Sequence, residues 1–396
     1  MAGAAGVAVA LHEAGRRDVA GTTTTEYLPR AATPRLPPTL AWPQWGRTPA
    51  RTRTSPGTLA PPYRVDWVFH GGSLLEFPPA IAYGHLYLPT FAGLLVALDP
   101  ATGRVDWRYD SHRCAWASPA AAGGLVYQTF LLRPPACRAS GDDRGELVAF
   151  DALTGNVRWR RSLPATESSP LAAGGLVWVG DWSGAVSAFD ANTGRRRWLA
   201  QLDGAVKSSP ALAGGRLLVG TYGGHLYAFD PRTGAELWRA STRPRLVGRG
   251  RFYSTPAAAH ARVYIGGTDG VVYAYGLRTG TLRWSFTTSG YVYGSPAVWR
   301  GLVLVGSYDG AFYALDAGTG RQRWRFDAGG PISGSASVVG DVVYVSTLAE
   351  RTYALNVRTG RELWRFPDGK YCAGVADRDR FYLVGANRLF GLVPRH

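Results

Sequence analysis

Tryptophan recurs at nearly even intervals along the 396-residue chain, and this spacing limits the possible fold more than any other feature. Successive gaps of 40, 52, 39, 40, 46, 40 and 40 residues separate Trp67, Trp107, Trp159, Trp198, Trp238, Trp284, Trp324 and Trp364. A period of this length, filled with short strands and tight turns, is typical of a β-propeller in which each repeat forms one four-stranded blade. Because many functions occur on propellers, the period predicts architecture, and function must be argued from a site.

The clearest repeat runs from Ser295 to Phe326 and divides into four extended stretches, designated A to D. We expect strand A over 296–299, strand B over 302–307 and strand C over 311–316, with Trp324 on strand D. A ring as large as tryptophan on strand D can cover the side of the next blade and bury on the order of 200 Å². The tryptophans are therefore expected to pack the blades together.

The turn between strands C and D is the most repetitive segment of the chain. Five copies read Asp-x-x-Thr-Gly and begin at Asp99, Asp151, Asp190, Asp230 and Asp316, whereas Gly276 and Asn356 replace the aspartate in two more. An Asp side chain accepts hydrogen bonds from backbone N–H groups two or three residues later, and glycine supplies the positive φ of the reversal. Turn formation explains these aspartates better than catalysis does.

The two ends of the chain are expected to form one blade together. Trp67 has no preceding Asp-x-x-Thr-Gly, and residues 387–392 have the pattern of a strand C with no strand D after it. We therefore predict an all-β fold over residues 42–396, an eight-bladed β-propeller of four-stranded blades whose last blade is closed by the N-terminal strand 63–69. Such a closure leaves no long edge open to other chains.

Residues 1–41 are expected to lie outside the propeller, as a disordered tether or the remnant of an export or anchor segment. The apolar run 2–11 is too short to span a bilayer, and residues 16–38 are rich in Thr, Pro, Ala and Arg, a composition typical of disorder. We expect contact with a membrane only through such an anchor.

The net charge is +16, and 42 of the 44 basic residues are arginine because lysine occurs only at Lys207 and Lys370. Two interpretations stay open. The charge can attract an anionic partner such as nucleic acid, phospholipid headgroups or an acidic polymer, or compositional bias can place arginine where lysine would serve equally. The arginines are scattered over every blade, and no specific nucleic-acid motif occurs.

Three cysteines are present. Cys114 lies in the loop that enters the second blade and Cys137 in the enlarged loop between strands B and C of that blade, so both are expected on one face. They can form a disulfide, which would imply an oxidising compartment, or they can be free thiols together with Cys372. No spacing of cysteine and histidine predicts a metal site.

The motif Ala-Leu/Phe-Asp-x-x-Thr-Gly-x-x-x-Trp, as at 97–107, resembles the repeat of the pyrroloquinoline-quinone-like (PQQ repeat) propellers, and residues 42–56 resemble the segment before their first blade. The resemblance covers about 42–394 and implies the eight-bladed fold. The family includes quinone-dependent alcohol and sugar dehydrogenases and non-catalytic outer-membrane-assembly propellers that hold a partner through their loops. Its alcohol dehydrogenases carry an adjacent Cys-Cys pair, calcium ligands and a catalytic Asp. Here no two cysteines are adjacent and the loops are short, so the chain is closer to the non-catalytic members.

A candidate binding face follows from aligning the blades on the start of strand A. The position three residues before the Pro that opens strand A is expected to line the mouth of the central channel, and it is occupied by Glu76, Trp116, Glu167, Lys207, Tyr253, Tyr293, Ser333 and Tyr371. The turns between strands B and C add Phe91, Trp182, Tyr222 and Tyr308 on the same face. Exposed aromatic residues are typical of interaction surfaces. Alternatively, these residues only plug the channel, with Glu167 and Lys207 as a local ion pair.

We therefore predict a monomeric, non-catalytic propeller scaffold, extracytoplasmic or in the cell envelope, that binds a protein partner or envelope component through this face and needs no cofactor or metal. Two alternatives stay open. One is a quinone-dependent dehydrogenase reduced to its propeller, with PQQ and Ca²⁺ at the channel mouth near Glu167, Lys207 and Trp116. The other is a sensor of saccharides or other envelope ligands that uses the same aromatic residues.

Overall fold

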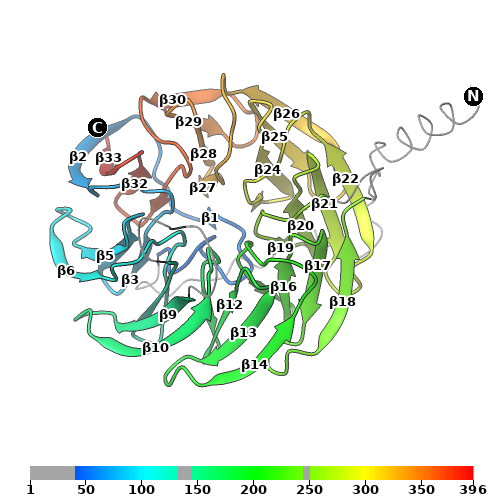
Figure 1. Cartoon of the computed structure of the whole chain (residues 1–396). Coiled ribbons are helices and arrows are strands. Elements are labelled where there is room, and N and C mark those ends of the chain that lie inside the picture. The colour runs from blue at the N-terminus through cyan, green and yellow to red at the C-terminus, as the bar shows by residue number, and fades with distance from the viewer. Residues whose placement is uncertain (1–40, 133–136, 138–143, 244–249, 396) are drawn as a thin grey trace, which may run out of the picture.

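The chain forms eight sheets arranged in a ring around a central channel (Figure 1). Seven sheets have four strands, and the sheet of the seventh blade has a fifth strand from the segment before the first blade. The structure, a computed structural model, describes residues 41–132, 137, 144–243 and 250–395. The predicted tether at 1–41 therefore lies outside the described residues except for Ala41. Within the described ranges the regular elements are all strands, and no helix there is long and apolar enough to cross a membrane. The predicted eight-bladed propeller is confirmed.

Blades are numbered 1 to 8 in chain order, and each runs from strand A at the channel to strand D at the rim (Figure 1). The A strands are β3 (Ala80–Ala82), β7 (Ala120–Ala122), β11 (Leu171–Ala173), β15 (Ala211–Ala213), β19 (Ala257–Ala259), β23 (Ala297–Trp299), β27 (Ser337–Val339) and β31 (Val375–Ala376). The B strands are β4 (His85–Pro89), β8 (Leu125–Phe130), β12 (Leu176–Gly180), β16 (Arg216–Gly220), β20 (Arg262–Gly266), β24 (Leu302–Gly306), β28 (Val342–Thr347) and β32 (Phe381–Val384).

The outer half of each blade consists of strands C and D. The C strands are β5 (Leu94–Leu98), β9 (Arg144–Asp151), β13 (Ala185–Asp190), β17 (His225–Phe229), β21 (Val271–Gly276), β25 (Ala311–Asp316), β29 (Arg351–Asn356) and β33 (Arg388–Pro394). The D strands are β6 (Val105–Asp110), β10 (Val157–Pro164), β14 (Arg196–Gln201), β18 (Glu236–Ser241), β22 (Leu282–Thr287), β26 (Gln322–Asp327), β30 (Glu362–Phe366) and, for blade 8, β2 (Tyr63–His70). In blade 6 the observed strands A and B are each one residue shorter than the prediction, and strand C agrees with it.

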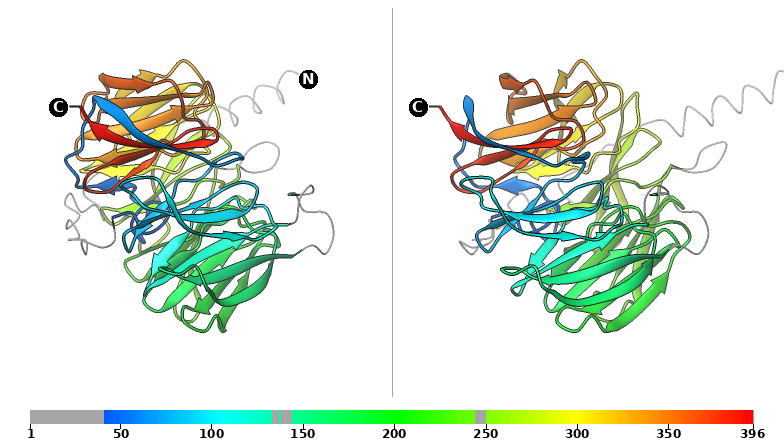
Figure 2. Two further views of the ribbon diagram at one scale, coloured as in Figure 1. Left: turned by 90° about the vertical axis from the view of Figure 1, so that its left-hand side faces the viewer. Right: turned by 60° about the vertical axis from the view of Figure 1, so that its left-hand side comes forward.

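The ring is closed by β2, which pairs antiparallel with β33 from Tyr63 opposite Pro394 to His70 opposite Arg388. Figure 2 shows the N-terminal strand, in blue, beside the C-terminal strand, in red. The predicted closing strand 63–69 is confirmed, with one additional residue. Closure removes the free edge that blade 8 would otherwise present.

Seven of the eight rim tryptophans pack against the glycine of the C–D turn in the following blade. The exception is Trp364, which contacts Tyr63 of the closing strand because blade 8 has no C–D turn. The indole N–H of Trp284, for example, donates to the carbonyl of Ala317 in blade 6 at 2.9 Å, and a Cβ built on Gly320 of that turn would lie 2.8 Å from the ring. Gly320 also has a φ of +77°. The glycine of the turn motif is thus needed twice, because it supplies the reversal and leaves room for the neighbouring tryptophan.

Several arginines of strand D pair with the turn aspartate of their own blade. Arg158 lies 2.7 Å from Asp151, and Arg197 lies 2.6 Å from Asp190. These arginines and the turn hydrogen bonds lower the pKa values of Asp151 and Asp190 to about 2. Part of the positive charge at the rim is therefore compensated locally.

Residues 42–55, here called the belt, pass around the channel and were not recognised from the sequence as part of the core. The belt accepts a hydrogen bond from the second residue of strand A in each of blades 1 to 7. The donors are the backbone N–H groups of Ile81, Ala121, Ala172, Leu212, Ala258, Val298 and Val338. The belt ends in β1 (Thr54–Ser55), which pairs parallel with β27. It ties seven blades together at the axis.

Two arginines of the belt are fully buried in the channel. Arg51 donates to the carbonyl oxygens of Pro210 at 2.8 Å, Pro170 at 3.1 Å and Trp45. Arg53 donates to Ala336 at 2.8 Å and lies 4.0 Å from the centre of the Trp45 ring. Burial lowers the pKa of Arg51 to about 9 and that of Arg53 to about 10. The charges are held by backbone carbonyls instead of by carboxylates.

Candidate binding pocket at the channel mouth

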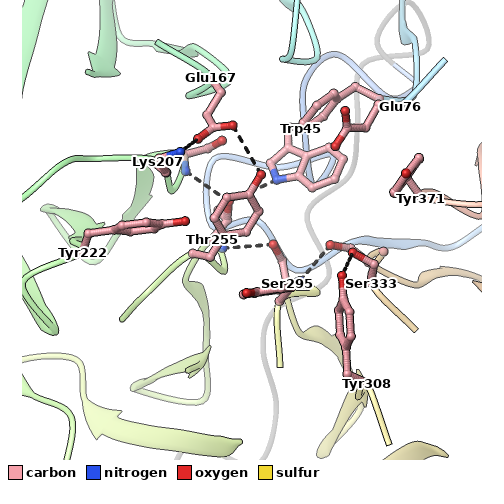
Figure 3. A pocket seen from close by; sticks show the side chains of 16 residues that line it. Trp45, Glu76, Glu167, Lys207, Tyr222, Thr255, Ser295, Tyr308, Ser333 and Tyr371 are labelled. Carbon is pink, nitrogen blue, oxygen red and sulfur yellow. Dashed lines mark hydrogen bonds and ion pairs between the residues drawn. The ribbon is translucent and has the colours of Figure 1, made fainter. Parts of the chain in front are cut away.

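A cavity of about 340 Å³ opens at the channel mouth, on the face that carries the D–A and B–C loops (Figure 3). It is lined by Trp45, Glu76, Phe77, Glu167, Lys207, Ser209, Tyr222, Tyr253, Thr255, Tyr293, Ser295, Tyr308, Ser333, Gly334, Ser335 and Tyr371. Seven of the eight positions expected to line the mouth are among them, and Trp116 is the exception. Of the four B–C turn residues, Tyr222 and Tyr308 line the cavity.

Hydroxyl groups link successive blades just below the mouth. The hydroxyl of Thr255 accepts from the backbone N–H of Ser209 at 3.1 Å and from the indole N–H of Trp45 at 3.2 Å. In the same way, Ser295 accepts from the N–H of Thr255 at 3.0 Å, and Ser335 accepts from that of Ser295 at 2.7 Å. The Ser or Thr before strand A is therefore a bridge between blades. The sequence signal for these bridges is the Ser or Thr that recurs before Pro. It was used only to align the blades, so the hydrogen bonds between blades were not predicted.

Glu167 and Lys207 form an ion pair on the wall of the pocket. The Nζ atom of Lys207 lies 2.8 Å from Oε1 of Glu167, whose side chain is only 5% exposed. Tyr253 donates its hydroxyl to the other carboxylate oxygen at 3.4 Å. Burial raises the pKa of Glu167, although Lys207 acts in the opposite direction. Lys207 also lies 4.3 Å from the centre of the Trp182 ring and 5.2 Å from that of Tyr222.

Glu76 is the second carboxyl group of the pocket, and no residue in the described ranges donates a hydrogen bond or forms an ion pair with it. Its carboxylate points into the cavity next to Trp45 (Figure 3). Burial, and then the charge of Glu167, raise the pKa of Glu76 to about 7. At neutral pH the pocket therefore holds one carboxyl group with no partner among the described side chains.

Five tyrosines form a continuous cluster across blades 4 to 6, here called the tyrosine patch: Tyr222, Tyr253, Tyr291, Tyr293 and Tyr308. Neighbouring ring centres lie 6.2 Å apart for Tyr222 and Tyr253, 5.3 Å for Tyr253 and Tyr293, and 5.0 Å for Tyr293 and Tyr308. Tyr291 contacts Tyr293 and Tyr308 from outside the cavity and is 52% exposed. Tyr291 was not singled out from the sequence, although it stands two residues before the aligned Tyr293. The patch joins the pocket to the protein surface.

Phe91, Trp116 and Trp182 form a separate aromatic cluster beside the pocket. The ring centres of Phe91 and Trp116 lie 5.6 Å apart, and those of Trp116 and Trp182 lie 6.4 Å apart. Trp116 and Trp182 pack against buried Leu131 and Cys114. Contrary to expectation, Trp116 does not line the mouth, because its indole is part of this apolar cluster, which spans loops of blades 1 to 3.

Cys114 is joined to Cys137 by a disulfide, with Cα atoms 5.6 Å apart. The bond links the loop before blade 2 to the long B–C loop of that blade, and Cys372 is free and buried. The disulfide lies in the same cluster as Trp116 and thus fixes the wall beside the pocket.

The donors of the pocket do not match those of a calcium-bound quinone. Calcium prefers six to eight oxygen ligands. Among the residues that the structure describes, no group of three or more His, Cys, Asp or Glu side chains is placed to hold a metal ion. Glu167 is already engaged by Lys207, and the disulfide joins cysteines 23 residues apart instead of an adjacent pair. The residues of the pocket therefore do not fit PQQ with Ca²⁺.

The closed ring, the repeated Trp–Gly contacts and the aromatic mouth define an eight-bladed propeller of the PQQ-repeat class. Comparison with protein families narrows this class. The chain belongs to the family described as outer membrane protein assembly factor BamB, whose model matches residues 143–290 and again 222–370, together more than half of the chain.

Individual relatives are more distant. Outer membrane protein assembly factor BamB of Nitrosomonas eutropha (strain DSM 101675 / C91 / Nm57) is 35% identical over 94 residues, which span 24% of this chain and 20% of that protein. The crystal structure of BamB from Moraxella catarrhalis superimposes with a TM-score of 0.70 at 19% identity, over 84% of this chain and all of that one. The quinohemoprotein alcohol dehydrogenase ADHIIG from Pseudomonas putida HK5 gives 0.76 at 15% identity, over 90% and 80% of the two chains. Likeness at such low identity shows the fold alone.

Proposed function

We propose that this protein is a non-catalytic scaffold of the cell envelope that takes part in outer-membrane protein assembly by holding a protein partner on its D–A and B–C loop face. Membership of the assembly-factor family supports a role in the cell envelope and in outer-membrane protein assembly. The observation that carries the proposal is the tyrosine patch, because it ends in the exposed ring of Tyr291 at the surface of this face.

The chemistry of the patch suits a protein interface. Tyrosine buries a large area at a low cost in side-chain entropy, and tyrosine, tryptophan and arginine dominate binding hot spots. Arg251 adds its guanidinium 5.4 Å from the centre of the Tyr222 ring. Aromatic contacts fix the rings before any partner arrives, so little freedom is lost on binding.

The disulfide between Cys114 and Cys137 supports an extracytoplasmic location. Structural disulfides persist in oxidising compartments such as the bacterial periplasm and are rare in the cytosol. Since the bond holds the loop next to the proposed face, an oxidising compartment would also keep the binding surface in shape.

The test is co-purification of envelope proteins with a tagged chain. Tyr291→Ala combined with Tyr293→Ala removes the outer part of the patch, whereas Leu153→Ala alters a residue that is 65% exposed on the C–D turn of blade 2, on the opposite face. We expect the double variant to lose a stoichiometric partner that the wild type and Leu153→Ala retain. Equal recovery with all three proteins would contradict the proposed face.

The dehydrogenase alternative makes a different prediction. If PQQ and Ca²⁺ bind the purified protein and support reduction of a dye with alcohols or sugars as substrates, the scaffold proposal fails as a complete account. We expect no turnover, because the pocket presents one paired and one unpaired glutamate instead of a set of calcium ligands. Protein without added PQQ and Ca²⁺ and the variant Glu167→Gln serve as controls.

A further inference from the structure

We propose that the pocket at the channel mouth is a binding site for a small organic ammonium ion, with Glu76 as its counter-charge and the surrounding tyrosines as its walls. This inference goes beyond the proposed function and does not depend on it. The ligand would enter the cavity of about 340 Å³, whereas a protein partner would contact the exposed rim.

Among the described charged side chains that line the pocket, one carboxylate, that of Glu76, has no cationic partner. Lys207 is the only cationic side chain among the lining residues, and it is engaged by Glu167 at 2.8 Å. Glu76 has no such partner among the described residues. Glu76 is half-buried, and a carboxylate that is partly removed from water costs free energy unless a charge or hydrogen bond compensates it. A bound cation would provide that compensation, whereas an anion would add repulsion.

The buried arginines of the belt do not compensate the charge of Glu76. Arg51 donates to three backbone carbonyls, and Arg53 bonds to the carbonyl of Ala336 and stacks on Trp45. Neither arginine lines the cavity. Trp45 lines the cavity and contacts Arg53, so its ring separates Arg53 from the space open to a ligand.

The walls have the composition that recognises ammonium groups. Aromatic rings attract a cation placed over their faces, and several rings around one site form the cage used for alkylammonium ligands. The cavity is lined by Trp45, Phe77, Tyr222, Tyr253, Tyr293, Tyr308 and Tyr371. Burial holds the pKa values of Tyr222, Tyr253 and Tyr293 above the usual range, so these rings are neutral at physiological pH.

The wall already holds one ammonium group in this way. The Nζ atom of Lys207 lies within cation–π distance of both Trp182 and Tyr222 while its charge faces Glu167. Glu76 and the rings on the other side of the mouth repeat this combination of a carboxylate and aromatic faces, without a lysine. The size of the cavity is at the lower end for small-molecule sites, which favours a compact ligand over a polymer.

Calorimetric titration of the purified protein at pH 8, where Glu76 is mostly ionised, tests the proposal. The probes are tetramethylammonium and n-butylammonium, with butan-1-ol, butyrate and glucose as neutral, anionic and saccharide comparisons. We expect saturable binding of the two ammonium ions and none of the other three. Nα-acetyl-lysine amide is a further probe and shows whether a lysine side chain binds more tightly than n-butylammonium. Binding of both probes supports the site, whichever of the two binds more tightly.

The matched variants are Glu76→Gln, which keeps the shape of the pocket, and Glu236→Gln, which removes an exposed carboxylate on β18. We expect Glu76→Gln to weaken ammonium binding at least tenfold and Glu236→Gln to leave it unchanged. A thermal melt of Glu76→Gln at or above the wild-type temperature shows that the variant is folded. Undetectable ammonium binding to wild type, equal binding of butan-1-ol or glucose, or an unchanged affinity in Glu76→Gln would overturn the proposal, and none of these outcomes bears on recovery of the protein partner.

Discussion

The glycine of the C–D turn illustrates how one residue type serves two constraints. Gly320 has a φ of +77° and lies under the buried ring of Trp284 from the preceding blade. Gly123, in the A–B turn of blade 2, has a φ of +60° but no atom within 4 Å of an added Cβ. Alanine at Gly123 would therefore add backbone strain alone, whereas alanine at Gly320 would add both backbone strain and a close contact with the tryptophan.

Gly320→Ala is expected to destabilise the protein by about 2–4 kcal/mol, because overpacking adds to the strain of a left-handed alanine. Gly123→Ala should cost only the strain, about 1 kcal/mol. Thermal melts of the two variants against wild type measure the difference. Equal losses would show that the Trp284 ring can move away without cost.

Glu76 should make stability depend on pH. Its pKa is raised from 4.5 to about 7 in the folded protein, so the unfolded chain loses this proton first as the pH rises. The contribution of Glu76 to stability therefore falls between about pH 4.5 and pH 7 and stays low above that range. Glu76→Gln should be more stable than wild type by about 1–3 kcal/mol at pH 8 and equal to it at pH 4, as measured by chemical denaturation. A constant difference at both pH values would contradict the assigned environment.

Among the elements, the belt does most to connect distant parts of the chain. It bonds to the A strand of blades 1 to 7 and places Arg51 against the carbonyl oxygens of Pro170 and Pro210. A short segment whose regular structure is confined to β1 thereby satisfies backbone donors that would otherwise face an empty channel.

Arg51→Met is expected to destabilise the protein by about 2–4 kcal/mol, since three buried carbonyls lose their donor and only part of this is offset by removing a buried charge. Arg195→Met, at an exposed position on the C–D turn of blade 3, should stay within about 0.5 kcal/mol of wild type. Chemical denaturation compares the two. A neutral or stabilising effect of Arg51→Met would show that the belt holds the blades through its backbone alone.

The disulfide is the other element-level constraint. Reduction of Cys114–Cys137, which closes a separation of 23 residues, should lower stability by about 3 kcal/mol. The reductant should have no effect on the double variant Cys114→Ser, Cys137→Ser, and this comparison isolates the bond. A melting temperature of the wild type that does not respond to reductant would contradict a structural role.

The ring as an assembly was readable from the sequence because its signals repeat. The rim tryptophans, the Asp-x-x-Thr-Gly turns and the missing strand of the last repeat predicted eight blades and the closure by β2, and aligning the repeats placed seven of eight residues at the mouth. The belt occurs once and contacts residues far away in the chain, so no period revealed it. Trp116 differed because it packs with Phe91 of blade 1, Trp182 of blade 3 and the disulfide, and the period of the repeat does not reveal such a cluster.

The proposed role of the complete propeller requires that its two faces behave differently. A photo-crosslinking residue placed in turn at Tyr291, on the loop face, and at Leu153, on the opposite face, tests this in intact cells. The account predicts one discrete protein adduct from position 291 and none from position 153. Adducts from position 153 alone, or no adduct from position 291 at full expression, would contradict it.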